Sequence, residues 1–96
     1  MKAYLVLDFT VTDLPRFRRY VEEIPAHIER HGGRYIVRGV EPTLMEGDWK
    51  PERLVILEFP ERSNAKAFLA DPTIQDLFKI RHETTNSKLI LVEGCT

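Results

Sequence analysis

The sequence predicts one α+β domain in which the elements follow the order strand, helix, strand, strand, helix, strand. Three observations predict this order: alternating segments rich in strand-forming residues, two stripes of apolar residues at three- and four-residue spacing, and short connections rich in Gly, Pro and Asp. The chain has 96 residues, which is enough for one hydrophobic core. Residues 1–96 are therefore expected to form a single domain.

The first strand is expected over residues 3–11, where the odd positions are uniformly apolar. Asp13 is suited to cap the helix that follows, and Pro15 lies in its first turn, where a missing N–H costs little. Apolar residues then recur with helical spacing at Leu14, Phe17, Val21, Ile24 and Ile28. Pro25 is expected to kink this helix or divide it near Val21 or Glu22, and Gly32 and Gly33 to end it.

The rest of the chain is expected to contain three further strands and one interrupted helix. Strands are expected over 34–40, with a possible extension toward Met45, and over 53–59 and 88–93. A helix is expected over 62–70, and Asp71 with Pro72 restarts it through Arg81. Residues 46–51 are dense in turn formers and are expected to form a loop.

This order predicts a ferredoxin-like fold, in which a four-stranded antiparallel sheet carries both helices on one face. The odd residues of the first strand are expected to meet the helices, which leaves the other face bare. That bare face is expected to present Tyr4, Val6, Asp8, Thr10, Ile36, Arg38, Val40, Leu54, Ile56 and Glu58. Because so many of these side chains are aliphatic, we expect a second copy of the chain to cover them, giving a homodimer built as a dimeric α/β barrel.

Three charged residues are expected among these aliphatic neighbours: Asp8, Arg38 and Glu58. Buried charges must be paired or hydrogen-bonded, and burial moves their pKa values. One interpretation is catalytic, with a carboxylate of Asp8 or Glu58 as general base and Arg38 binding an anionic group. The other is a salt bridge that only fixes the dimer interface.

A second group of candidate residues follows the second strand. Glu46, Asp48, Trp49 and Arg53 lie in a loop and at the start of the next strand, where a tryptophan among charges suits the rim of a ligand-binding site. Alternatively, Glu46 pairs with Arg53 to brace the turn, and Trp49 covers the edge of the core.

His27 and His31 are four residues apart on the first helix, a spacing that suits a metal ion, but the sequence offers no third ligand and we predict no metal site. His31 alone is a candidate catalytic proton carrier at the helix end, because imidazole titrates near neutral pH. It could equally be placed there by the helix dipole. Arg81 and His82 are interpreted as the positive charge expected at the end of the last helix.

Composition excludes several classes of protein. Fourteen Lys and Arg oppose fifteen Asp and Glu, which gives no basic footprint for nucleic acid or for a membrane surface. The longest apolar stretches are too short to span a bilayer. The single Cys95 and the absence of a signal-peptide pattern favour the cytoplasm. No nucleophile motif, dinucleotide fingerprint or cofactor motif is present, so no cofactor is expected.

Blocks of residues along the whole chain resemble the DUF1330 family. The blocks are Asp13 with Tyr20, His31-Gly32-Gly33-Arg34-Tyr35, Arg38-Gly39, Glu46-Gly47-Asp48-Trp49, Pro51, Arg53, Glu58-Phe59-Pro60 and Val92-Glu93-Gly94. The resemblance implies a ferredoxin-like fold of the dimeric α/β-barrel group, but no activity, because that family has no established function. The chain departs from the family pattern at Val40, where a glycine is usual, and at Leu69 and Ile74, where aromatic residues are usual.

Two functions fit the sequence. One is a cofactor-free enzyme, isomerase-like or oxygenase-like, or a binding protein, that accepts a small anionic or phenolic metabolite within each half of the barrel. The other is a non-catalytic ligand-binding or stress-related dimer in which the charges are structural. Fold alone does not choose between them.

Overall fold

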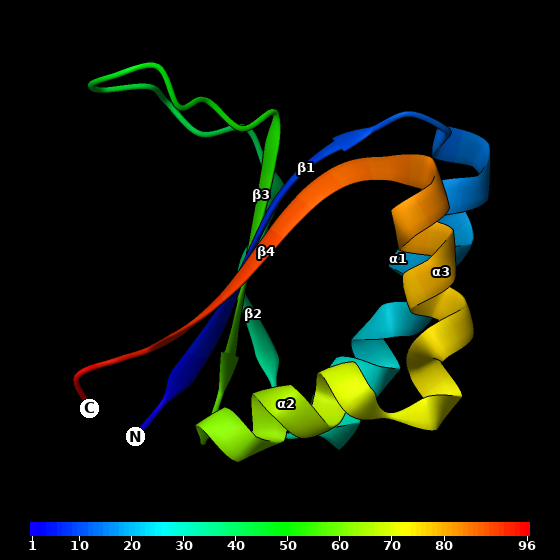
Figure 1. The fold of residues 1–96 in the computed structure, drawn as a ribbon, viewed down its shortest axis with the longest axis vertical. Helices are drawn as coiled ribbons and strands as arrows, with labels where there is room; N and C mark the ends of the chain where they lie inside the picture. The colour runs from blue at the N-terminus through cyan, green and yellow to red at the C-terminus, as the bar shows by residue number, and fades with distance from the viewer.

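The computed structural model describes every residue from Met1 to Thr96. The strands are β1 (Ala3–Val11), β2 (Arg34–Val40), β3 (Arg53–Phe59) and β4 (Thr85–Glu93), and the helices are α1 (Leu14–Arg30), α2 (Arg62–Ala70) and α3 (Gln75–Thr84), with a 3₁₀ turn η1 (Pro72–Ile74) before α3. The strands form one antiparallel sheet in the order β2-β3-β1-β4. All three helices lie on the same side of this sheet (Figure 1). The ferredoxin-like arrangement predicted from the sequence is therefore confirmed.

Element boundaries follow the predicted signals closely, with three differences. The strand β4 begins at Thr85 rather than Lys88, because pairing with β1 continues to the opposite end of that strand. The strand β2 ends at Val40 and does not extend toward Met45. The helix α1 is not divided near Val21 or Glu22; it runs without interruption from Leu14 to Arg30 with Pro25 inside it.

The core forms where the odd residues of β1 meet the helices, as the alternation predicts. Leu5, Leu7 and Phe9 are buried on this face of the sheet. The aromatic ring of Phe68 packs between those of Phe59 and Phe78, with ring centres 5.5 and 5.4 Å away. Burying each such side chain contributes about 1.5–3 kcal/mol, so this apolar layer is the main force that holds the helices onto the sheet.

The strand β2 departs from simple alternation, and for this reason the predicted position of Arg38 is wrong. Its register with β3 shifts twice, between Tyr35 and Val37 and again between Arg38 and Val40. Gly39, in the second irregularity, has a φ of 75°, a backbone conformation that side chains other than glycine rarely adopt. Because the first irregularity precedes Arg38, this residue pairs with Val55, opposite Leu7, and lies on the helix side of the sheet. Its predicted place on the bare face is wrong, and the first irregularity, which adds Ile36 to the strand ahead of Arg38, is the reason.

The bare face of the sheet is as apolar as predicted, through a partly different set of residues. One row crosses all four strands through Val37, Ile56, Val6 and Ile90, which are cross-strand partners. Ile90 is 60% exposed, and Val40 and Val92 beside this row are also exposed. The protomer therefore presents a continuous aliphatic band to solvent.

The longest helix, α1, has 17 residues and a strongly polar outer face. None of the helices combines the length and the hydropathy that a membrane crossing needs.

Candidate ligand-binding cavity

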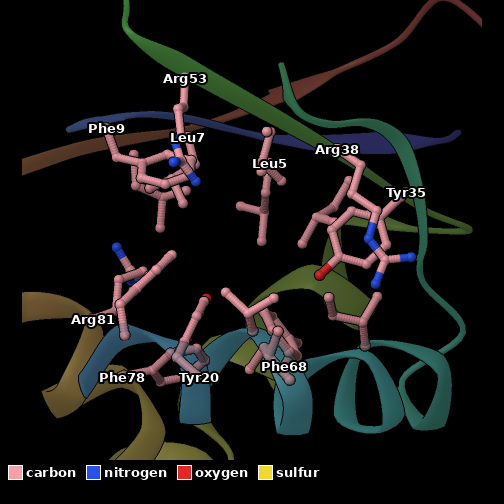
Figure 2. A pocket seen from close by; sticks show the side chains of 18 of the residues that line it. Leu5, Leu7, Phe9, Tyr20, Tyr35, Arg38, Arg53, Phe68, Phe78 and Arg81 are labelled. Atoms are coloured by element: carbon pink, nitrogen blue, oxygen red, sulfur yellow. The ribbon is translucent and has the colours of Figure 1, made fainter. Parts of the chain in front are cut away.

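A cavity of about 250 Å³ lies between the helices and the sheet. Apolar side chains from β1, β3 and the three helices form most of its wall. Figure 2 shows these side chains converging from the sheet on one side and from the helices on the other. The volume is slightly below the range of about 300–1,000 Å³ typical of ligand pockets, so the cavity suits a small molecule.

The charged side chains that line the cavity are all arginines: Arg38, Arg53 and Arg81. The only other ionisable groups in the lining are the phenols of Tyr20 and Tyr35. No carboxylate and no imidazole belongs to the wall. The interior is therefore apolar and carries positive charge without a protein counter-charge.

Arg81 is the most unusual of these residues because it is only 5% exposed. Its Nη1 donates a hydrogen bond to Ser87 Oγ at 3.2 Å, while its buried Nε has no partner. The guanidinium carbon lies 5.7 Å from the centre of the Phe78 ring. Buried arginines are usually paired with an acid, because desolvating a charge is costly. Arg81 has hydrogen bonding and aromatic contact, but no acidic partner.

Tyr20 stands beside Arg81 on the helix side of the cavity, with its hydroxyl directed toward the interior (Figure 2). Burial raises the pKa of this phenol to about 12, although the positive charge of Arg81 acts in the opposite direction. Tyr20 is therefore a neutral phenol at physiological pH. It can donate a hydrogen bond to a bound molecule.

Arg38 and Tyr35 form a second polar group at the other end of the cavity (Figure 2). The guanidinium carbon of Arg38 lies 4.4 Å from the centre of the Tyr35 ring, a cation–π contact. Burial raises the pKa of the Tyr35 phenol, with the charge of Arg38 opposing it. Arg53 reaches the cavity from β3 near Phe9 (Figure 2). Neither Arg38 nor Arg53 forms a salt bridge.

Asp8 and Glu58, predicted to lie together with Arg38, are separated from it and from each other. Asp8 accepts a hydrogen bond from Trp49 Nε1 at 2.8 Å. Glu58 accepts one from Arg34 Nε at 3.1 Å and lies 3.4 Å from Lys2 Nζ. These contacts, that of Arg34 first, lower the pKa of Glu58. Both carboxylates lie on the side of the sheet away from the cavity.

The loop group is also divided by the structure. Arg53 lines the cavity, whereas the indole of Trp49 is 63% exposed and contacts Asp8 on the opposite side of the sheet. Glu46 and Asp48 are exposed in the loop that projects from the body between β2 and β3 (Figure 1). Glu46 forms no salt bridge with Arg53, so the predicted brace is wrong.

His31 ends α1 and contacts Asp71 at the start of η1, with Nε2 2.8 Å from Oδ2. Arg30 Nη1 reaches the same oxygen at 2.8 Å, and the backbone N–H of Thr73 donates to Oδ1. These bonds, led by that of His31, hold the pKa of Asp71 well below its usual range. His31 belongs to this junction between helices and not to the cavity wall. His27 lies 2.6 Å from Arg30 Nη2, and no cluster of three metal-ligating side chains forms anywhere in the chain.

Sequence reasoning missed Arg81, Tyr20 and Tyr35 as members of the site. A signal for Arg81 was present, because it continues the apolar stripe of Leu77 and Phe78 at helical spacing instead of standing on the solvent side. Tyr20 likewise falls three residues after Phe17 and four before Ile24. A polar residue inside an apolar stripe points to a buried site.

Solved structures share this fold at low sequence identity. A protein of unknown function from Rhodopseudomonas palustris has a TM-score of 0.80 at 17% identity, over 99% of this chain and 83% of that chain. A dimeric ferredoxin-like protein of unknown function from Jannaschia sp. CCS1 has a TM-score of 0.73 at 9% identity, over 98% and 100% of the chains. The cofactor-independent oxygenase SnoaB from Streptomyces nogalater has a TM-score of 0.70 at 20% identity, over 99% and 94%. At these identities the likeness establishes the fold alone.

No curated protein matches the sequence. A family model described as a domain of unknown function, DUF1330, matches residues 2–95, which is nearly the whole chain. The resemblance expected from the conserved-looking blocks is thereby confirmed: this chain belongs to the DUF1330 family.

Proposed function

We propose that the chain forms a homodimer in which each protomer binds a small, largely apolar molecule that carries an anionic or phenolic group, in the cavity between helices and sheet. The observation that carries this proposal is Arg81, a nearly buried guanidinium without an acidic partner in a cavity whose only charges are positive. A bound anion offsets the cost of burying that charge and adds charge-assisted hydrogen bonds. The apolar wall then contributes affinity through burial of the remainder of the ligand.

Two observations support dimerisation. The aliphatic band across Val37, Ile56, Val6 and Ile90 lies on the face that the helices leave open. The structurally similar protein from Jannaschia is described as dimeric. Packing two such faces together removes the band from water and leaves each cavity on the outer side of its own sheet.

An enzymatic role is a second candidate, favoured by one feature of the cavity. Guanidinium groups beside a bound phenol stabilise its phenolate, the electron-rich form that cofactor-free oxygen chemistry requires, and SnoaB is described as a cofactor-independent oxygenase. The residues predicted as catalytic, Asp8, Glu58 and His31, do not line the cavity, so a general base from the wall is lacking. We therefore propose binding as the function that the geometry supports best.

A ligand screen tests the proposal. Benzoates, phenols, short fatty acids and neutral analogues are added to wild type, Arg81→Met and the control Lys79→Met, which removes an exposed charge from the same helix. At about 100 times its Kd a ligand stabilises the folded state by about 2.7 kcal/mol, a clear rise in the unfolding temperature. We expect anionic ligands to raise it in wild type and in Lys79→Met but not in Arg81→Met.

Two results decide against parts of the proposal. If no anionic or phenolic compound changes the unfolding temperature, or if Arg81→Met responds as wild type does, the cavity is not the anion site. Oxygen consumption with the phenols that bind separates the two candidates: uptake that depends on the protein and on Arg81 establishes an oxygenase, and its absence leaves a binding protein.

A further inference from the structure

The cavity has two polar ends separated by an apolar middle. Arg81 and Arg53 approach one end from opposite layers, and Arg38 with Tyr35 occupies the other (Figure 2). Leu5 and Phe68 lie between the two ends (Figure 2). This arrangement differs from a pocket with a single anion site, in which the far end would be apolar or open.

Each end is supplied with donors that the protein leaves unused. At the first end, Arg81 donates to Ser87 Oγ while its buried Nε has no partner, and Arg53 lines the same end of the cavity. At the second end, the guanidinium of Arg38 is held over the Tyr35 ring at 4.4 Å without any carboxylate contact. The stacking fixes the orientation of Arg38 in advance, so less side-chain entropy is lost when it binds a planar anion.

The residues around Arg38 explain why it faces the cavity at all. In a regular strand it would point to the bare face, beside Asp8 and Glu58. The irregularity in β2 between Tyr35 and Val37 turns it to the helix side. Bulges commonly redirect a side chain toward a site. Here the redirection places Arg38 away from the carboxylates of the bare face and with the other arginines of the cavity. Like charges collected in one cavity repel one another unless a ligand neutralises them.

The geometry points to an elongated ligand with two anionic groups, a dicarboxylate with an apolar middle, whose first carboxylate binds Arg81 and Arg53 and whose second binds Arg38 and the Tyr35 hydroxyl. This inference rests on the proposed ligand binding and narrows it from anionic molecules in general to one class. A bidentate carboxylate–guanidinium pair at each end would set both the orientation and the length of the ligand. The apolar middle rejects molecules that carry further charge at their centre.

The test compares two series of straight-chain acids, monocarboxylates and α,ω-dicarboxylates of about six to ten carbons, a range suited to a small cavity. Titration calorimetry is carried out on wild type, Arg81→Met, Arg38→Ala, Arg38→Lys and Arg18→Ala. Arg18 is exposed on α1, lies outside the cavity wall and makes no salt bridge, so its variant controls for loss of one positive charge. Because Arg38 is also exposed, its truncation leaves the core intact, and a urea midpoint equal to that of wild type verifies this.

We expect one length of dicarboxylate to bind wild type at least about tenfold more tightly than the monocarboxylate of equal length, as a second charge-assisted contact would give. Arg38→Ala should bring the dicarboxylate down to the monocarboxylate level and leave the monocarboxylate unchanged. Arg38→Lys should keep part of the preference, Arg81→Met should weaken both series, and Arg18→Ala should change neither.

Equal affinity of the two series at every length, or a dicarboxylate preference that survives Arg38→Ala, overturns this inference while leaving the proposed anion site in place. Binding of phenols without binding of either acid series likewise contradicts the dicarboxylate inference and leaves the proposed ligand site in place. If wild type binds no acid and no phenol, the proposed function fails together with the inference, so the two failures are distinguished by the phenol arm.

Discussion

The guanidinium carbon of Arg81 lies 5.9 Å from the centre of the Tyr20 ring, inside the layer between helices and sheet. This contact brings a permanent cation next to a phenol that burial keeps neutral, with a pKa of about 12. The pair supplies an electrostatic anchor and a hydrogen-bond donor at one point of an apolar wall. Its consequences reach beyond ligand binding, because both groups also affect the stability of the empty protein.

The shifted tyrosine predicts an alkaline loss of stability. Tyr20 has a pKa of about 12 in the folded chain and about 10 when unfolded, so above pH 10 the unfolded state releases its proton more readily. Stability is fully present below about pH 10 and falls as the pH rises toward 12, by up to about 2–3 kcal/mol from this group. Tyr35, whose pKa is also raised, acts in the same direction.

Urea unfolding of wild type and Tyr20→Phe at several pH values up to about 11 measures this effect. We expect the free energy of unfolding of wild type to decline more steeply above pH 10 than that of the variant. Parallel declines in the two proteins would show that the Tyr20 phenol titrates as freely in the folded chain as in the unfolded one.

Removing the charge of Arg81 is expected to abolish ligand binding without reducing the stability of the empty protein. Arg81→Met replaces a desolvated guanidinium by an apolar side chain of similar length. It loses a charge-assisted hydrogen bond to Ser87 worth about 1.5–3 kcal/mol, but it also removes the cost of burying the charge, which is several kcal/mol per ion. We expect the empty variant to be at least as stable as wild type in urea unfolding, while its ligand-induced stabilisation is lost.

The opposite pattern would contradict the anion-site interpretation of Arg81. A variant destabilised by more than about 3 kcal/mol would mean that the guanidinium is already well satisfied within the protein and is part of the core structure. The control Lys79→Met should match wild type in both stability and ligand response.

The junction between α1 and η1 predicts a loss of stability in acid. The bonds from His31, Thr73 and Arg30 hold the pKa of Asp71 well below its usual value of 3.8. A carboxylate with a depressed pKa contributes stability above its unfolded pKa; this contribution begins to decline as the pH falls below about 4 and is lost completely only when the pH falls through the lower folded-state pKa. Asp71→Asn keeps the shape of the side chain but lacks this charge.

Thermal unfolding between neutral pH and about pH 3 checks the prediction against Asp71→Asn and the control Asp76→Asn, an exposed residue of α3. We expect Asp71→Asn to have a lower midpoint than wild type at neutral pH and the difference to narrow as the pH falls from about 4 toward 3, whereas Asp76→Asn follows wild type throughout. A constant difference between wild type and Asp71→Asn would assign the effect to shape and not to charge.

The sequence predicted the fold well because every element carried its own local signal. Asp13 caps α1 as expected, accepting a hydrogen bond from the Arg16 N–H, and Asp71 caps η1 through Thr73. The uniformly apolar odd residues of β1 identified the face that meets the helices. These signals depend on neighbours within a few residues, which a sequence displays directly.

The site was predicted less well because it depends on register across strands. Strict alternation through β2 placed Arg38 on the wrong face, since each irregularity in a strand shifts the side chains after it. The irregularity that moves Arg38 lies between Tyr35 and Val37, where no glycine marks it, and it emerges only from the pairing with β3. Likewise, the end-of-helix position of Arg81 suggested a solvated charge, and only the packing of α3 against the sheet shows that it is buried.

The bare face of the sheet predicts self-association that a single charge abolishes. Ile90 lies opposite Val6, at the end of the aliphatic row on the edge strand β4, so a lysine at this position would be buried without a partner between two sheets. We expect wild type to sediment as a dimer at micromolar concentration and Ile90→Lys as a monomer, with the dissociation constant raised by about a hundredfold or more.

The control Ala67→Lys adds the same charge at an exposed position of α2, on the other layer of the domain, and should remain dimeric. A monomeric wild type would contradict dimerisation, and a dimer that tolerates Ile90→Lys but not Ala67→Lys would place the interface elsewhere. Ligand binding by a monomeric Ile90→Lys would show that the cavity does not need the dimer.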